Sequence, residues 1–275
     1  MKWYVTGDTH GLVNTRLHNF NIIPNETALI ILGDAGINYY LNKTDKKNKK
    51  LINDKECLIY CVRGNHEQRP ELIETMVDVW DQNVEGYVWY EPDFPNIRYF
   101  KDGHAYIING LKTLVVGGAY SVDKWYRLAR AQVKETYDEM QIIHKAGWFP
   151  QEQLTEEEKR QILIAHTGEH FDLVLTHTCP FSWEPTDLFL SGLDQSSVDK
   201  SMELFFETLK NAIDWDVWLF GHYHADRLER PHVEQFFHDI ESLDVIWERW
   251  HSDNAEELPG WWLLDKSPMY YSEEK

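Results

Sequence analysis

The sequence predicts an α/β fold, and two of its features carry the prediction. Short apolar runs rich in strand-forming residues occur at 3–6, 28–32 and 57–62, and a glycine closely follows each of them. Such runs are typical of buried strands. The polar stretches 12–20 and 38–54 that separate them are long enough for crossover connections. The chain is therefore expected to begin as βαβαβ with a parallel sheet.

The middle of the chain predicts a second sheet followed by a helix. Three closely spaced strand-like pieces, broken by glycines, indicate antiparallel hairpins: 97–100, 105–109 and 113–116. The pattern over 122–145 is helical, and we expect this helix to end at Gly147.

The second half predicts another α/β alternation. Thr155 and Glu158 have the spacing of a capping box, which begins a helix that we expect to end near Gly168. Strands return at 173–176 and 217–220, with a helical stretch over 197–212 between them.

Two segments differ in composition from the rest. The stretch 43–50 holds five lysines and predicts a solvated loop, with the guidance of an anionic substrate as the alternative. After Ala225 the chain is predicted to be irregular and rich in aromatic residues. We expect one domain over 1–230 and a C-terminal extension over 231–275 that packs on it, with a partner surface as the alternative for its aromatic residues.

Charge and cysteine content exclude several classes of protein. The 275 residues include 27 Lys and Arg against 46 Asp and Glu, a formal net charge of −19, which counts against a broad nucleic-acid-binding face or an anionic membrane surface. The sequence has no apolar run of membrane-spanning length and no signal-peptide pattern, so we expect a cytoplasmic protein. Cys57, Cys61 and Cys179 form neither a disulfide framework nor a zinc motif and are predicted to pack in the core.

Polar residues suited to metal binding follow five of the predicted strands. They are Asp8, His10, Asp34, Asn65, His177, His222 and His224. In an open α/β sheet, ligands bind beyond the carboxyl ends of the strands, so these side chains are expected to converge. Residues two apart in extended chain point the same way, so each closely spaced pair can face a single site.

This donor set indicates a metal centre with two ions. Imidazole and carboxylate ligands together suit zinc, iron or manganese, and seven donors exceed what one ion needs. Two ions can share a carboxylate and a bridging hydroxide and hold a phosphate for in-line attack on phosphorus. His66 adjoins Asn65, and we expect it to assist the leaving group as a general acid.

The ordered motifs resemble those of the calcineurin-like metallophosphoesterase superfamily over residues 1–230. The matching motifs are Gly7-Asp8-x-His10-Gly11, Gly33-Asp34, Gly64-Asn65-His66-Glu67, Thr176-His177 and Gly221-His222-x-His224. The resemblance implies two central mixed β-sheets that pack as a sandwich and are flanked by helices.

The same resemblance implies a role for each motif residue. Asp8, His10 and His224 would bind the first ion. Asn65, His177 and His222 would bind the second. Asp34 would bridge the two ions, and His66 would be the catalytic histidine. Manganese is the expected ion, with iron, zinc, nickel or magnesium as alternatives.

One departure from the pattern bears on the substrate. The first and third motifs resemble the phosphoprotein phosphatase branch, which continues its second motif with an aspartate that would orient the catalytic histidine and with a phosphate-gripping arginine. Here Asp34 is followed by Ala-Gly-Ile-Asn, so both residues are missing. Glu67 could orient the histidine or cap the following helix instead. Candidates for contact with phosphate are Arg63, Arg127 and Tyr120.

The sequence thus predicts a metal-dependent hydrolase of phosphate esters. Its substrate would be a phosphorylated small molecule, a nucleotide or a phosphoprotein. The alternatives within the class are a serine/threonine protein phosphatase, a nucleoside polyphosphate hydrolase and a nuclease, and the acidic charge counts against the last. A metal-binding interaction scaffold without activity is the alternative of another class. A metal-free nucleophilic hydrolase is disfavoured because no Gly-x-Ser-x-Gly motif occurs.

Overall fold

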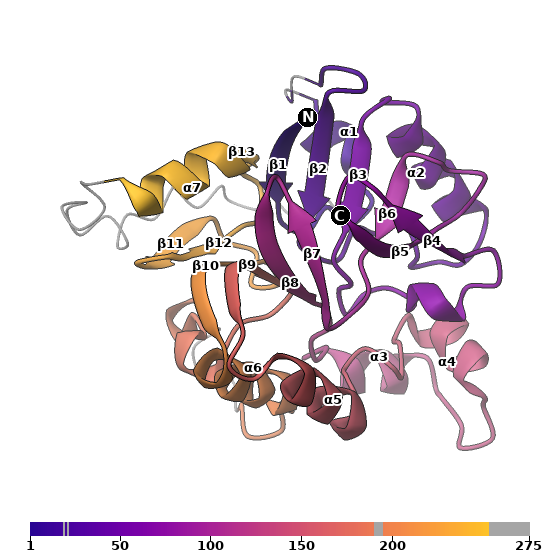
Figure 1. The fold of residues 1–275 in the computed structure, drawn as a ribbon. Helices are drawn as coiled ribbons and strands as arrows, with labels where there is room; N and C mark the ends of the chain where they lie inside the picture. The colour runs from indigo at the N-terminus through magenta and orange to yellow at the C-terminus, as the bar shows by residue number, and fades with distance from the viewer. Residues whose placement is uncertain (19, 21, 190–194, 253–275) are drawn as a thin grey trace.

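A computed structural model describes residues 1–18, 20, 22–189 and 195–252 and shows two β-sheets packed face to face (Figure 1). Within these residues, the first sheet has seven strands in the order β13-β1-β2-β3-β6-β5-β4. Their bounds are β1 Lys2–Thr6, β2 Thr27–Ile31, β3 Leu58–Cys61, β4 Val77–Asp81, β5 Gly86–Tyr90, β6 Ile97–Tyr99 and β13 Glu241–Ser242. Strands β1, β2, β3 and β6 are parallel, and antiparallel strands lie at both edges.

The second sheet has six strands in the described chain, in the order β11-β12-β10-β9-β8-β7. Their bounds are β7 His104–Ile108, β8 Leu111–Val116, β9 His170–Thr176, β10 Asp214–Phe220, β11 Arg227–Arg230 and β12 Val233–Gln235. Strands β8, β9, β10 and β12 are parallel, with antiparallel β7 and β11 at the edges.

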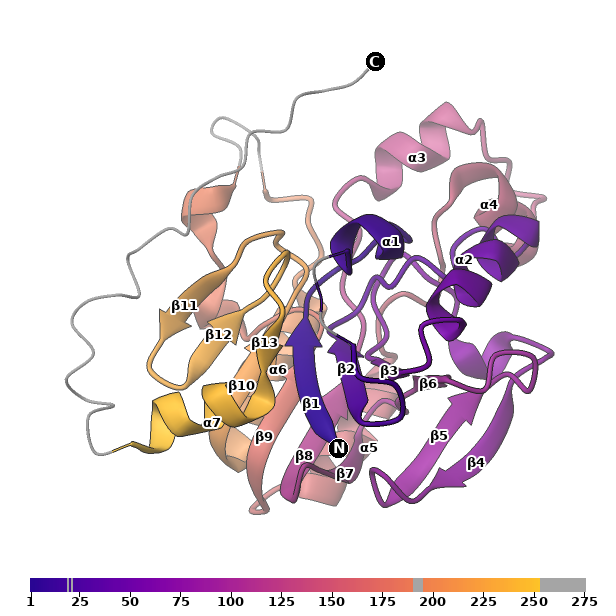
Figure 2. The ribbon, with the colours of Figure 1, turned by 90° about the horizontal axis from the view of Figure 1, so that it is seen from above.

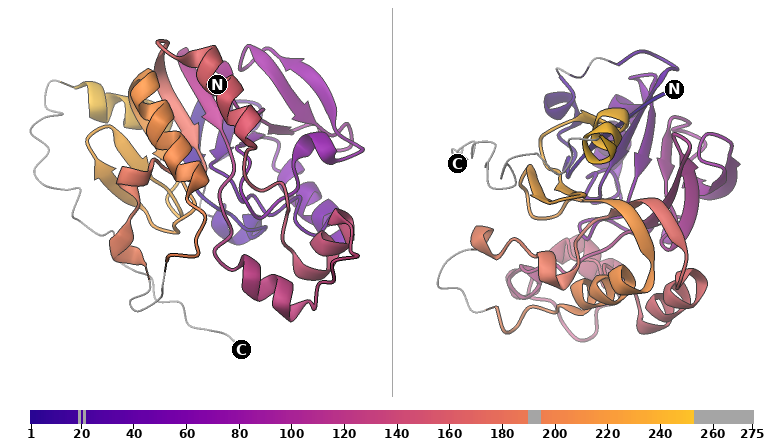
Figure 3. Two further views of the ribbon diagram at one scale, coloured as in Figure 1. Left: turned by 90° about the horizontal axis from the view of Figure 1, so that it is seen from below. Right: turned by 60° about the vertical axis from the view of Figure 1, so that its left-hand side comes forward.

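Helices cover the outer faces of the two sheets and complete four layers (Figures 1 and 3). The helices are α1 Val13–Arg16, α2 Lys43–Asn53, α3 Lys124–Arg130, α4 Glu139–Ala146, α5 Glu156–His166, α6 Ser201–Ala212 and α7 Leu243–His251. Three 3₁₀ turns span Pro70–Leu72, Phe181–Trp183 and Thr186–Leu188. The predicted sandwich of two mixed sheets flanked by helices is confirmed.

Strand alternation explains the layers. Ile30 of β2 packs between the two sheets, in a cluster that also holds Leu175 of β9. Its neighbour Leu29 points to the other face and packs with Ile52 of α2. On the far side of the second sheet, Phe206 of α6 belongs to a third apolar cluster. Both faces of each central sheet are therefore buried, as the near-continuous apolar runs predicted.

The predicted helix over 122–145 is wrong in one respect, because the structure has two helices there. The chain leaves α3 after Arg130, and Gln132 has a φ of 51°. Asp138 then caps α4 through a capping box with Gln141, so a second helix begins at Glu139. The predicted end at Gly147 is confirmed by its left-handed φ of 64°. The capping box of Thr155 at the start of α5 is also confirmed.

The prediction of a loop over 43–50 is wrong as well, because these residues begin α2. Asn42 caps the helix by accepting a hydrogen bond from the amide of Thr44. Lys49 is buried and forms an ion pair with Glu91, while the other lysines of the run are exposed. One side of a charged stretch can face a sheet when a carboxylate there neutralises the buried ammonium.

The segment after Ala225 is more regular than predicted. It supplies β11, β12 and β13 to the two sheets and ends the described chain in α7, where Trp250 is buried and Trp247 packs against the central cluster. Trp261, Trp262, Tyr270 and Tyr271 lie outside the described residues. Strands β4 and β5 were not predicted. All three cysteines are buried, as expected, and no described helix is long and apolar enough to cross a membrane.

Candidate metal centre

Five strand ends bring the predicted ligands together at one edge of the sandwich. Asp8 and His10 follow β1, Asp34 follows β2, Asn65 follows β3, His177 follows β9, and His222 and His224 follow β10. Figure 2 shows α1 beyond the arrowhead of β1, at the end of the molecule where these loops meet. The two parallel cores thus align their carboxyl ends, so residues more than two hundred positions apart become neighbours.

The first cluster consists of Asp8, His10 and His224. The Nε2 atoms of the two histidines are 3.0 Å apart. Oδ2 of Asp8 lies 3.3 Å from Nε2 of His224 and 3.9 Å from Nε2 of His10. This oxygen is buried and has no hydrogen-bond partner among the described residues, while Oδ1 accepts from the amide of His222 at 3.0 Å. Three donor atoms directed at one another, one of them a buried carboxylate oxygen, fit a bound cation.

The second cluster consists of Asp34, His177 and Asn65. Nδ1 of His177 donates to the carbonyl of Leu32 at 2.7 Å, which leaves the lone pair on Nε2. That Nε2 lies 2.9 Å from Oδ1 of Asn65 and 3.7 Å from Oδ2 of Asp34. A lone pair facing two oxygen acceptors is unfavourable unless a cation or a proton lies between them. The arrangement therefore fits a second ion.

His222 lies between the two clusters. Its ring centroid is 5.0 Å from that of His177, and its amide binds Asp8. Burial lowers the pKa of His222 to about 3, with the neighbouring His177 acting in the same direction. The imidazole is consequently neutral near pH 7, as a metal ligand must be.

The two carboxylates of the centre are ionised. Burial alone would raise the pKa of Asp8 and of Asp34, but the surrounding histidines outweigh it. For Asp8 the nearby His224 is the largest lowering cause, and for Asp34 it is the nearby His177. Two ionised and fully buried carboxylates make a negative site that attracts divalent cations.

Backbone strain concentrates in these loops. Four candidate ligands have left-handed φ angles: His10 at 47°, Asp34 at 48°, His222 at 69° and His224 at 54°. Such conformations cost on the order of 1 kcal/mol or more each and persist where surrounding contacts enforce them. Their clustering marks this edge as a functional site.

Gly33 makes room for the second cluster. Its φ is 96°, and a Cβ atom at this position would overlap the imidazole of His177. Only glycine therefore allows the β2 loop to pass so close to that ring.

Three residues that support the centre were not predicted. Nδ2 of Asn65 donates to Oγ of Ser121 at 2.9 Å, and Ser121 in turn donates to Oε2 of Glu152 at 2.5 Å. This chain turns the carbonyl oxygen of Asn65 toward His177. Arg16 binds the carbonyl oxygens of Asp8 and Phe237 and so ties the β1 loop to the segment after β12. No local pattern indicated these residues, and Ser121 lies 56 positions from Asn65 and 31 from Glu152.

His66 lies beside the two clusters. Glu67 neither orients His66 by a hydrogen bond to its ring nor caps a following helix. The His66 amide donates to Oδ1 of Asp34 at 2.8 Å, and the His66 ring centroid is 6.1 Å from that of His10. Glu67 accepts from the amide of Gly64 at 2.6 Å and thereby closes its own turn. Burial, together with the charge of Asp34, raises the pKa of Glu67 to about 8.

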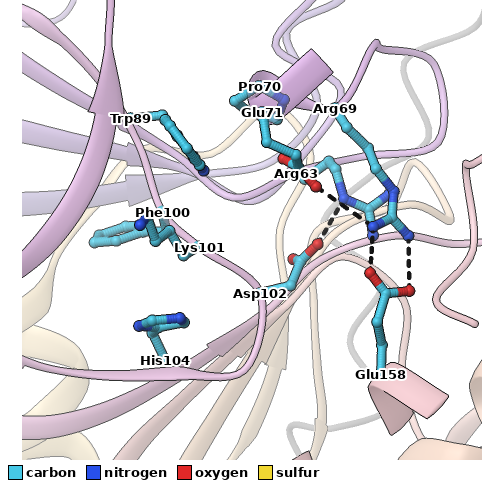
Figure 4. A pocket seen from close by; sticks show the side chains of 10 residues that line it. All are labelled: Arg63, Arg69, Pro70, Glu71, Trp89, Phe100, Lys101, Asp102, His104 and Glu158. Atoms are coloured by element: carbon cyan, nitrogen blue, oxygen red, sulfur yellow. Dashed lines mark hydrogen bonds and ion pairs between the residues drawn. The ribbon is translucent and has the colours of Figure 1, made fainter. Parts of the chain in front are cut away.

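The structure does not support Arg63 as a phosphate contact. Its side chain is 1% exposed, and its Nε pairs with Asp102 at 2.7 Å. Its Nη1 donates to the carbonyl of Glu152 at 2.7 Å. Figure 4 shows Arg63 and Asp102 at a pocket of about 260 Å³ that none of the predicted metal ligands lines.

The other two substrate candidates differ in accessibility. Tyr120 is buried. Arg127 is 22% exposed, and its Nε forms an ion pair with Asp123 at 2.6 Å. Arg127 is thus more accessible than Tyr120, but its guanidinium also donates to the Tyr39 hydroxyl and to the carbonyl of Gly147.

A third group of potential ligands lies at the amino ends of β9 and β10. Nε2 of His170 is 3.6 Å from Asp172 and 3.4 Å from Asp216. A hydrogen bond to Asp214 raises the pKa of this exposed histidine, which favours its protonated form as a counter-charge to the aspartates. This group shares no residue with the centre described above.

A comparison with protein families now identifies the chain. The family described as Calcineurin-like phosphoesterase matches residues 1–226. The chain belongs to this family. Family membership confirms the predicted superfamily and implies a hydrolase of phosphorylated substrates that uses divalent metals. No curated protein is significantly similar to the chain.

Proposed function

We propose that this calcineurin-like phosphoesterase is a two-metal hydrolase of phosphorylated small molecules or nucleotides, with manganese as its ion. The observation that carries the proposal is the pair of donor clusters at one sheet edge, joined by Asp8 and Asp34. Both carboxylates are buried, and three imidazoles turn Nε2 toward them.

The proposed ligands divide between two ions. Asp8, His10 and His224 would hold one ion, and Asn65, His177 and His222 the other. Asp34 forms a close group with Asp8 and His177, which supports its role as the bridge between the ions. Divalent ions bound there would neutralise charge on the phosphate oxygens and lower the pKa of a nucleophilic water.

His66 would act on the opposite side of phosphorus. Its ring is partly exposed and has no hydrogen-bond partner among the described residues, so a ring nitrogen is free to face a substrate. As the bond from phosphorus to the leaving oxygen breaks, a ring N–H of His66 would donate its proton to that oxygen. Removal of such a general acid typically costs about 10²–10⁴-fold in rate.

The acidic charge supports a small substrate. A net charge of −19 repels a nucleic acid backbone. Arg63, a candidate for contact with phosphate, already forms an ion pair with Asp102. We propose a cytoplasmic location and a phosphomonoester or phosphodiester as the substrate. A protein phosphatase is the less favoured reading because the second motif lacks its aspartate and arginine.

The test is hydrolysis of para-nitrophenyl phosphate and of bis-para-nitrophenyl phosphate by metal-stripped protein refilled with Mn²⁺. We expect Mn²⁺-dependent turnover that Asp34→Asn abolishes and that Asp54→Asn, at an exposed carboxylate, leaves unchanged. The preferred ester then distinguishes a monoesterase from a diesterase. Metal bound at both clusters without turnover on either ester would favour the scaffold.

A further inference from the structure

The imidazole of His66 is held by packing rather than by a carboxylate. No described side chain forms a hydrogen bond to its ring. Two rings border it: His10, with a centroid separation of 6.1 Å, and Tyr39, at 6.4 Å and an interplanar angle of 68°. Since His10 is a candidate ligand, Tyr39 is the neighbour available to orient His66.

Tyr39 lies on the loop after β2, and this loop is fixed to the turn that carries His66. The carbonyl of Asn38 accepts from the amide of Gln68 at 2.9 Å. The ring of Tyr39 also meets Phe149 edge to face, at 5.9 Å and 61°. Edge-to-face ring pairs of this kind contribute about 0.5–1.5 kcal/mol beyond the area that they bury.

The hydroxyl of Tyr39 is anchored by the α3–α4 segment, residues 122–151, which contains both helices. Nη1 of Arg127, on α3, donates to this hydroxyl at 2.7 Å and to the carbonyl of Gly147 at 3.0 Å. Gly147 ends α4, and a Cβ atom there would overlap the Tyr39 hydroxyl. Asp123 holds the other side of the guanidinium. Both ends of the tyrosine side chain are therefore fixed.

The same segment also reaches the metal ligand next to His66. Ser121 and Glu152 flank this segment. Ser121 accepts a hydrogen bond from Asn65 and donates one to Glu152, so the pair holds the Asn65 side chain. The adjacent residues Asn65 and His66 thus depend on contacts made by this segment and by the two residues that flank it.

We propose that Tyr39 is the positioning residue of His66, and that Arg127 and Gly147 hold it in place. The inference rests on the proposed role of His66. Tyr39 takes over the orienting task of the aspartate that the second motif lacks, but by ring packing instead of a hydrogen bond. A displacement of about 1 Å in a catalytic group can cost about 10²-fold in rate, so loose packing here would be measurable.

The kinetic test compares Tyr39→Ala, Tyr39→Phe and Arg127→Met in the Mn²⁺-loaded protein. We expect Tyr39→Ala to lower kcat at least about 10-fold with KM within about twofold, because Tyr39 acts through His66 and not on the substrate. Tyr39→Phe keeps the ring and should retain most of the activity. Arg127→Met should have a kcat between those of Tyr39→Ala and Tyr39→Phe. Arg130→Met, on the exposed face of the same helix, should leave kcat unchanged.

A double-mutant cycle makes the test specific. In a His66→Ala background, Tyr39→Ala should cause no further loss, since the group that it positions is gone. Independent, additive losses would overturn the proposal. Loss of substrate affinity with unchanged kcat would overturn it too, because that result assigns Tyr39 to substrate contact.

An NMR measurement on the metal-free protein separates this inference from the proposed function. The imidazole signals of His66, assigned with His66→Gln, should shift in Tyr39→Ala and stay close to wild type in Tyr39→Phe, which keeps the ring current. Tyr126→Ala, an exposed tyrosine on α3, serves as the control. Unshifted His66 signals in Tyr39→Ala would refute the contact whether or not the protein hydrolyses a phosphate ester.

Discussion

Replacement of Ser121 by alanine should weaken the binding of one metal ion and not of the other. Ser121 accepts from Nδ2 of Asn65 and donates to Glu152, and all three side chains are buried. Without it, the Asn65 amide is free to turn, and its oxygen no longer faces His177. Loss of such an outer-shell partner typically lowers metal affinity about 10–100-fold. That range corresponds to about 1.4–2.7 kcal/mol of binding free energy.

The assay is calorimetric titration of the metal-free protein with Mn²⁺. We expect two binding events in the wild type, of which Ser121→Ala weakens the one that involves Asn65. Ser182→Ala, at an exposed serine, is the matched control and should leave both events unchanged. If both dissociation constants of Ser121→Ala stay within about twofold of wild type, the reasoning about Asn65 is refuted.

Three further predictions concern the neighbourhood of the centre. Gly33→Ala should abolish binding of the ion at His177 by steric overlap, whereas Gly168→Ala, which also has a positive φ but open space around it, should keep full Mn²⁺ stoichiometry by equilibrium dialysis. Glu67 has its folded pKa raised from 4.5 to about 8, so its contribution to stability is present below pH 4.5 and is lost as the pH rises through 8. Urea unfolding of the metal-free protein should therefore show a smaller loss of stability over this range in Glu67→Gln than in wild type, and an equal loss would contradict the assignment. Arg63→Met should lower the unfolding free energy by roughly 3 kcal/mol through loss of a buried ion pair while KM is unchanged, and a raised KM would restore Arg63 as a substrate contact.

Much of the centre could be predicted because its residues follow strands directly. A strand end followed by glycine and then by aspartate or histidine specifies both the edge of the sheet and the donor type. Asp8, Asp34 and His222 each come directly after such a glycine, close to the end of a strand. The local sequence therefore indicated which residues are metal donors, and the parallel sheet topology brings the carboxyl ends of these strands together.

The supporting contacts could not be predicted in this way. Ser121 and Asn65 are 56 positions apart, and Tyr39 and Arg127 are 88 positions apart. Their pairing depends on how the α3–α4 segment folds back on the β2 loop, which no local pattern specifies. Arg63 shows the opposite case: its position beside a motif predicted substrate contact, but in the structure its side chain is buried and pairs with Asp102.

The short strands of the C-terminal part were missed for a related reason. Strand β12 spans Val233–Gln235 and buries Glu234, whose carboxylate accepts from Arg249 and from the indole of Trp250. A buried charge does not give the apolar pattern of a strand, and its partners are supplied by α7. By contrast, the capping-box spacing of Asp138 and Gln141 is a local signal for α4 that the prediction of one helix over 122–145 missed.

The central claim is that Asp34 joins two metal ions in one centre. Its most direct test is the number of Mn²⁺ ions bound per chain, measured by equilibrium dialysis with hydrolysis of para-nitrophenyl phosphate recorded at each Mn²⁺ concentration. We predict two ions in the wild type, with turnover that appears as the second one binds, and in Asp34→Asn fewer ions and no turnover. A wild-type protein that binds one ion or none, or an Asp34→Asn protein that hydrolyses the ester as well as wild type does, would contradict the account.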